Sequence, residues 1–320
     1  MTFDSILVTG SSGMIGTALV ERLLSEEYDV CGVDIVSNPW SEEVDDATQL
    51  IDLREERALE RLPSDVDSIV HLGAHARVHR LVERPELAME NMAMTFNLLE
   101  FARTNDVSHF LFASSREVYG NTSQVVYDES ATFADTSESP YTASKIGGES
   151  MVTAYNQCYD MTTMIVRFSN VYGRYDTADR VVPLFIARCD NALDLTVYGA
   201  NKVLDFTYID DCVDGLYKMI DQHHKVKNMT LNIASGQGTS LIELARRVNE
   251  LTPHDSAITV ESTRTGEVSQ YVADIERAKR ILEYEPEFRF CDGIEKTVSW
   301  YLEHPSVLDQ IPAGSTDADP

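Results

Sequence analysis

Three glycines near the start of the chain constrain the fold most. Gly10, Gly13 and Gly16 follow an apolar run at 5–9 and precede a segment, 17–25, in which the apolar residues have helical spacing. A glycine-rich turn between a strand and a helix lets the backbone approach a pyrophosphate closely, and the helix N-terminus stabilises the negative charge. The three glycines therefore predict a dinucleotide-binding unit at the N-terminus.

Strand-like and helix-like segments alternate beyond this unit. Apolar runs occur at 29–34, 67–72, 108–114 and 162–168, and helical patterns occur at 85–105 and 140–159. This alternation predicts an α/β fold with a Rossmann-type, doubly wound parallel sheet. Past residue 175 the pattern loosens, with helices expected near 183–191, 211–223, 240–251, 275–282 and 292–304 and a strand at 195–198.

We accordingly divide the chain into three parts. Residues 1–175 are expected to form the NAD-binding domain with the catalytic residues, and 176–310 are expected to be mainly a smaller substrate-binding region. The last segment, 311–320, is rich in Pro, Ala, Gly, Ser and Asp, and we expect a disordered tail there.

The charge balance excludes some partners. The 320 residues include 53 acidic and 26 basic side chains, a formal net charge of −27, which repels nucleic acid and anionic lipid surfaces. No apolar run approaches the roughly 20 residues of a membrane helix. The acidic residues are spread along the chain, which favours a surface adapted to high salt over a single acidic face for a partner.

The cysteines and the N-terminus predict the compartment. The five cysteines are odd in number, widely spaced and without a CxxC pair, so we expect no disulfide framework and no metal site. The N-terminus lacks a basic region before its first apolar run, so we expect no signal peptide. Both observations indicate a reducing cytoplasm.

Asp34 predicts which dinucleotide is bound. It ends the apolar run at 29–34, 18 residues after Gly16. A carboxylate at this place accepts hydrogen bonds from the adenosine ribose hydroxyls and repels a 2′-phosphate, so NAD is favoured over NADP. Asp52 and Leu53, after the next short apolar stretch, are weaker candidates for the adenine pocket.

Three side chains predict proton transfer. Tyr141 and Lys145 are four residues apart on an expected helix, so both project from one face. The ammonium is expected to lower the phenol pKa from its usual value of about 10, which makes Tyr141 a candidate general base. Ser114 ends the run at 108–114 and Ser115 follows it, at the edge where doubly wound sheets bind ligands.

The chain resembles the extended short-chain dehydrogenases/reductases. The motifs that carry the resemblance occur in the family's order at 9–16, 71–74, 114–120, 141–145 and 167–173. The resemblance spans roughly residues 5–300. Within the family, the chain is most similar to the nucleotide-sugar epimerases and dehydratases, and UDP-glucose 4-epimerase is the nearest named activity.

The resemblance implies roles for individual residues. Ser115 would hold the sugar 4-hydroxyl, Tyr141 would remove its proton, and Lys145 would bind the nicotinamide ribose. The implied NAD contacts are Gly10, Gly13, Met14, Ile15, Gly16, Asp34, Asp52, Leu53, Ala74, Asn91, Tyr141 and Lys145. The implied substrate contacts are Ser115, Glu117, Asn170 at the diphosphate, and Arg264, whose guanidinium would grip the nucleotide diphosphate.

One residue departs from the family pattern. Leu204 stands where an arginine is usual in the segment 203–211. One diphosphate contact is therefore missing, or Lys202 supplies it.

The residues after Ser115 bear on the reaction. Related dehydratases carry Asp-Glu there, but this chain has Arg116 and Glu117, and arginine cannot donate a proton at neutral pH. We therefore predict epimerisation at C4 of a UDP-glucose or UDP-galactose type hexose through a 4-keto intermediate. The alternatives are a UDP-glucuronate decarboxylase, a 4,6-dehydratase and, more distantly, a non-catalytic NAD-binding sensor or scaffold. The sequence does not identify the sugar or the base.

The helical segments at 85–105 and 140–159 resemble those through which family members dimerise as an intermolecular four-helix bundle. We therefore expect a homodimer. The alternative is that the two helices only cover the sheet of a monomer.

Overall fold

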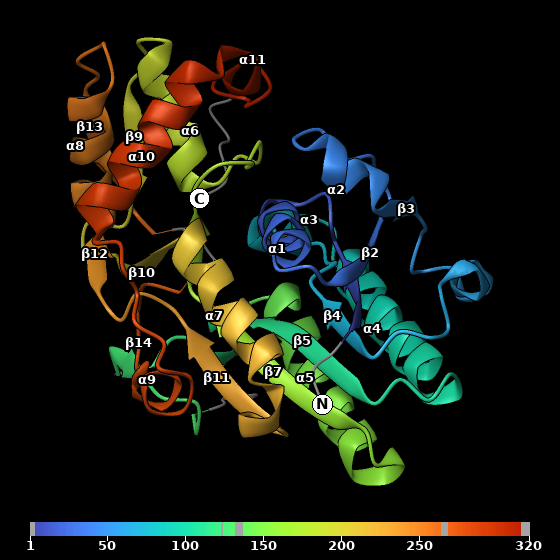
Figure 1. Cartoon of the computed structure of the whole chain (residues 1–320). Coiled ribbons are helices and arrows are strands. Elements are labelled where there is room, and N and C mark those ends of the chain that lie inside the picture. Colours follow the sequence, from blue (N-terminus) through green and yellow to red (C-terminus); the bar gives the residue numbers. More distant parts are fainter. Residues whose placement is uncertain (1–3, 123, 132–136, 264–267, 315–320) are drawn as a thin grey trace.

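A seven-stranded parallel sheet forms the centre of the molecule (Figure 1). The computed structural model describes residues 4–122, 124–131, 137–263 and 268–314. The strand order is β11-β7-β5-β4-β1-β2-β3. The strands are β1 (Ser5–Thr9), β2 (Asp29–Asp34), β3 (Thr48–Leu50), β4 (Ser68–His71), β5 (His109–Ser115), β7 (Thr162–Phe168) and β11 (Met229–Ile233).

Helices cover both faces of this sheet. Successive side chains of a strand point to opposite faces, so Ile6 and Val8 pack with α1 (Met14–Ser25) and α7 (Ile209–Asp221). Leu7, between them, packs with α4 (Glu86–Thr104) and α5 (Pro140–Tyr159). Because both faces are covered, the central strands are rich in apolar residues on both sides, as parallel strands usually are.

The predicted Rossmann-type α/β class is confirmed. The runs expected at 5–9, 29–34 and 162–168 are β1, β2 and β7 with the same bounds. The sequence analysis missed β11, which lies within 176–310 but pairs with β7 in the central sheet. The segment 229–233 is short and contains polar residues, so its apolar pattern is too weak to identify a strand.

The second region packs beside the sheet and is built from small sheets and helices (Figure 1). One sheet has the order β12-β10-β14-β6, with β8 paired to β10, and β13 pairs with β9. Its strands are β6 (Val126–Tyr127), β8 (Asn170–Tyr172), β9 (Leu195–Tyr198), β10 (Val203–Tyr208), β12 (Gly238–Ser240), β13 (Ile258–Glu261) and β14 (Gln270–Ala273). The larger helices of the second region are α6 (Val181–Asp190), α8 (Leu241–Leu251), α9 (Glu276–Leu282) and α10 (Phe290–Glu303).

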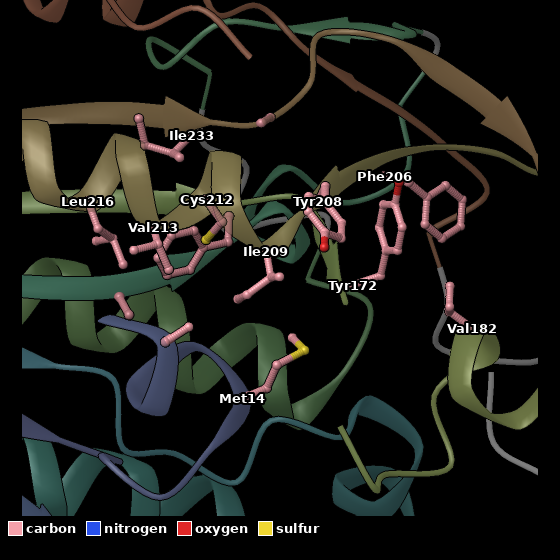
Figure 2. Packing of buried hydrophobic residues seen from close by; sticks show 14 of the residues in the cluster. Met14, Tyr172, Val182, Phe206, Tyr208, Ile209, Cys212, Val213, Leu216 and Ile233 are labelled. Atoms are coloured by element: carbon pink, nitrogen blue, oxygen red, sulfur yellow. The ribbon is translucent and has the colours of Figure 1, made fainter. Parts of the chain in front are cut away.

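One hydrophobic core joins the two regions. Figure 2 shows Met14 of α1 facing Ile209 of α7, with Tyr172, Phe206 and Tyr208 of the second region beside them. All five side chains are buried. The second region is therefore held firmly against the end of α1 that carries the glycine-rich turn.

Part of the expected tail is packed. Ile311 and Ala313 are buried, and the Ala313 carbonyl accepts a 2.8 Å hydrogen bond from Arg188 of α6. Residues 315–320 lie outside the described residues, so for them the disordered tail stays a prediction. Within the described ranges, no helix is long and apolar enough to cross a membrane. All five cysteines are free thiols.

Candidate active site

A cavity of about 450 Å³ opens at the carboxyl ends of the parallel strands. Residues directly after β1, β2, β4 and β5 line it on one side, and residues of β8, α6 and β10 line it on the other. This is where doubly wound sheets bind ligands. Six Lys or Arg and five Asp or Glu line the cavity, so its wall is slightly cationic in a protein of net charge −27.

The glycine-rich turn forms one end of the cavity. Gly10 has φ +73°, a conformation that favours glycine. A Cβ on Gly16 would lie 1.9 Å from the Gly10 carbonyl oxygen, so no side chain fits there. Gly13 precedes α1, and no side chain caps the first N–H groups of that helix. These open donors and the close backbone approach fit a dinucleotide pyrophosphate.

Asp34 is held by the same turn. Its carboxylate accepts backbone hydrogen bonds from Ser12 (3.0 Å) and Ile35 (2.7 Å) while it lines the cavity. These bonds fix the carboxylate but leave lone pairs for ribose hydroxyls. Asp34 therefore has acceptor capacity at the cavity wall, and its contact with the adenosine ribose stays a prediction.

Most of the other implied cofactor residues also line the cavity, namely Met14, Ile15, Asp52, Leu53 and Ala74. The sequence analysis missed Arg54, whose Nε and Nη2 hold the two oxygens of Asp52 at 2.9 and 2.6 Å. Hydrogen bonding to Arg54 lowers the pKa of Asp52. The signal for this pairing was the i, i+2 spacing of the two residues after the short strand.

Two implied residues are not seen at the cavity. Asn91 is buried and does not line it: its amide holds the main chain of His75, accepting from the N–H at 2.8 Å and donating to the carbonyl at 3.1 Å. A direct NAD contact of Asn91 stays a prediction. Arg264 lies outside the described residues, so its role also stays a prediction.

Ser115, Tyr141 and Lys145 come together at the centre of the cavity. Ser115 ends β5, and the other two project from the first turns of α5, which Ser139 caps by accepting a hydrogen bond from Thr142. The Ser115 hydroxyl is near enough to the Tyr141 phenol to lower its pKa. The Lys145 ammonium lies 5.9 Å from the Tyr141 ring centroid.

The expected effect of Lys145 on the pKa of Tyr141 is wrong in this structure. Burial raises the pKa of Tyr141 to about 12, and the charge of Glu117 adds to the rise, although Ser115 and the nearby charges of Arg180 and Arg116 oppose it. Burial also lowers the pKa of Lys145 to about 8. Desolvation disfavours the charged form of both groups, and it outweighs their proximity. No local sequence pattern identified Arg180, because only the fold brings it near Tyr141.

Arg116 connects the catalytic strand to the substrate side. Its Nη2 contacts Glu117 Oε1 at 2.8 Å, and its Nε donates to Asn170 Oδ1 at 3.1 Å. The Asn170 amide in turn donates to the Asp205 carbonyl at 3.0 Å. Glu117 and Asn170 both line the cavity, as expected for substrate contacts. Leu204 and Lys202 are also in the wall, so a lysine is present beside the position of the missing arginine.

The family model described as the NAD dependent epimerase/dehydratase family matches residues 6–234. The chain belongs to this family. It is 30% identical to a putative UDP-glucose 4-epimerase of Methanocaldococcus jannaschii, over 92% of this chain and 97% of that protein. NAD is its cofactor, in agreement with the turn and with Asp34.

Two solved structures, of enzymes that catalyse different reactions, match this chain equally well. A UDP-glucose 4-epimerase of Thermotoga maritima with UDP-glucose superimposes with a TM-score of 0.86 at 27% identity, covering 94% of this chain and 99% of that one. A dTDP-glucose 4,6-dehydratase of Streptomyces venezuelae with NAD gives the same TM-score and identity, covering 94% and 98%. The enzyme family is therefore shown, and the reaction within it has to be argued from the site.

Proposed function

We propose that this enzyme epimerises C4 of a UDP-activated hexose through a transient 4-keto sugar. The observation that carries the proposal is the Arg116–Glu117 ion pair beside Ser115 and Tyr141. Elimination of water needs an acid at residue 116, and a guanidinium does not release a proton at working pH. Glu117 is bound to that guanidinium, which competes with any role as a free base.

The catalytic residues then have simple tasks. Bound NAD supplies a nicotinamide that takes up one hydride and returns it, so the cofactor is not consumed. Ser115 would hold the 4-hydroxyl, and the phenolate form of Tyr141 would take its proton as the C4 hydrogen leaves. The keto sugar then turns so that the opposite face of C4 lies toward the nicotinamide. Tyr141 would afterwards return the proton to the 4-oxygen. The charges of Arg180 and Arg116 favour the phenolate that accepts this proton, whereas burial and the charge of Glu117 oppose it.

The charge of the cavity supports an anionic substrate. The protein as a whole repels anions, yet Arg77, Arg180 and Lys202 line the substrate side of the cavity. Arg77 and Arg180 form ion pairs with Asp179 and Asp176. A nucleotide diphosphate can exchange for these carboxylates as a partner of the guanidinium groups.

The proposal is tested by incubating the protein with UDP-galactose and NAD⁺ in molar salt and following the sugars by NMR. We expect an equilibrium mixture with UDP-glucose. Conversion of dTDP-glucose to a 4-keto-6-deoxy sugar, or release of CO₂ from UDP-glucuronate, with UDP-galactose unchanged, would establish the dehydratase or the decarboxylase instead. NAD binding without turnover of any of the three would favour a sensor.

We also propose a homodimer formed through α4 and α5. Met89 and Phe96 are seven residues apart on α4, and their side chains are 69% and 48% exposed. Residues at this spacing share one helix face, so they form an apolar strip that a second copy would cover. We expect Phe96→Glu to yield a monomer in light scattering. Val126→Glu, at an exposed valine on β6, is the matched control and should leave the mass unchanged.

The acidic composition supports a protein of a salt-rich cytoplasm, and the free thiols of Cys158 and Cys291, both exposed, fit a reducing compartment. Salt screens repulsion among surface charges. We therefore expect the melting temperature to rise from dilute buffer to molar KCl. A protein that is most stable in dilute buffer would contradict the high-salt assignment.

A further inference from the structure

A buried chain of charged groups lies directly behind the catalytic residues. Glu149 follows Lys145 by one turn of α5, and its two oxygens accept hydrogen bonds from Arg167 of β7, with Nε at 2.9 Å and Nη2 at 2.8 Å. Lys145, Glu149 and Arg167 are all less than a tenth exposed. A fork-like pair of this kind, shielded from water, holds its members in one geometry.

The same carboxylate ties the catalytic helix to the catalytic strand. Glu149 Oε1 accepts from the Ser114 hydroxyl at 2.5 Å, and Ser114 is the neighbour of Ser115. One turn earlier on α5, Lys145 Nζ donates to the Ala113 carbonyl at 2.7 Å. Two side-chain bonds, one helical turn apart, therefore join α5 to the end of β5. These two bonds fix the position of the α5 side chains relative to Ser115.

The surroundings of Lys145 make Glu149 electrostatically important. His71, on β4, is neutral because burial lowers its pKa to about 3, and Tyr141, on α5, is neutral because burial raises its pKa to about 12. On the strand-end side, Arg116 is paired with Glu117, and Arg180 is paired with Asp176. Glu149 raises the pKa of Lys145 against the effect of burial. Arg167 balances the charge of Glu149.

We propose that Glu149 and Arg167 are positioning residues that hold Lys145 at the end of β5, where Glu149 favours the charged ammonium and Arg167 limits that effect. Neither residue lines the cavity, so both act through Lys145. The inference rests on the proposed role of Lys145 as an ammonium at the cofactor. In addition, the opposite charges of Glu149 and Arg167 determine the pH above which Lys145 loses its proton.

Substitutions at the two members should have opposite effects. Glu149→Gln leaves Arg167 as an unbalanced cation, so the pKa of Lys145 falls and NAD affinity is lost at lower pH, by about one pH unit. Arg167→Met leaves Glu149 as an unbalanced anion, so the loss of NAD affinity moves to higher pH. Arg167→Lys keeps the charge and is the matched control, with little shift expected.

The experiment measures the dissociation constant of NAD by fluorescence titration between pH 6 and pH 10 for the protein and these variants. This readout needs no sugar, so failure of the epimerase assignment does not affect it. Glu149→Gln combined with Arg167→Met removes both charges, so its loss of NAD affinity should occur between the pH values of the two single variants, and this comparison stands even if a single variant fails to fold. Shifts in the same direction, or no pH dependence in the unsubstituted protein, would overturn the proposal.

Discussion

Tyr141→Phe is expected to lower kcat for the sugar nucleotide by about 10³-fold, within the range that general acid–base groups contribute. The substitution removes only the hydroxyl near Ser115 and leaves the ring in its buried site. Lys145 still donates to the Ala113 carbonyl, and the cofactor end of the cavity is untouched. We therefore expect NAD to bind as before, which separates a lost proton transfer from a lost fold.

The control is Tyr172→Phe. Tyr172 lines the same cavity, but its hydroxyl bonds to the Phe290 carbonyl at 3.3 Å and does not face the catalytic pair. We expect its activity to stay within a few-fold of the unsubstituted protein. Conversion assays on both variants, with NAD affinity measured in parallel, check the assignment. If the Tyr141 variant keeps a tenth or more of the activity, that residue is not the base.

Gly16→Ala is expected to abolish NAD binding and to destabilise the protein by about 1–3 kcal/mol. The added Cβ would lie 1.9 Å from the oxygen and 2.7 Å from the carbon of the Gly10 carbonyl. Those atoms belong to the backbone of the turn, so they cannot move aside as a flexible side chain does. Relief of the clash must displace Gly10, and with it the N–H groups that face the pyrophosphate.

Gly147→Ala, on α5, is the matched control. Its Cβ would meet the sulfur and methyl of Met92 at 2.6 and 2.8 Å, the flexible end of a side chain that can change rotamer. Alanine also favours a helix interior by about 1 kcal/mol over glycine. Thermal melting and NAD titration of both variants give the comparison. Normal NAD affinity in the Gly16 variant would show that the turn is not the pyrophosphate site.

Local patterns in the sequence predicted the framework of the site. The glycines, the acid that ends β2 and the i, i+4 pair Tyr141 and Lys145 each depend on residues that are close in the chain. Ser139 and Pro140 mark the start of α5 by capping chemistry that is equally local. Parallel strands end at one edge of a sheet, so these segments had to meet there once the alternation was recognised.

The tertiary structure decided the charge states of the buried side chains and which distant residues pair. Arg167 and Glu149 lie 18 residues apart on β7 and α5, and no spacing rule connects them. The same holds for β11, which completes the central sheet from within the substrate-side part of the chain. The pKa of Tyr141 moves opposite to the expectation from Lys145 alone, because it depends on how much protein surrounds the phenol.

The sequence by itself therefore determined the fold class and the cofactor, and it predicted the cofactor turn and the candidate catalytic side chains, since each is encoded by periodicity or spacing over a few residues. Only the tertiary structure decided that Arg116 donates to Asn170, and that a buried ion pair lies behind Lys145. Desolvation and long-range ion pairing depend on residues distant in the chain, and these come together only when the protein folds.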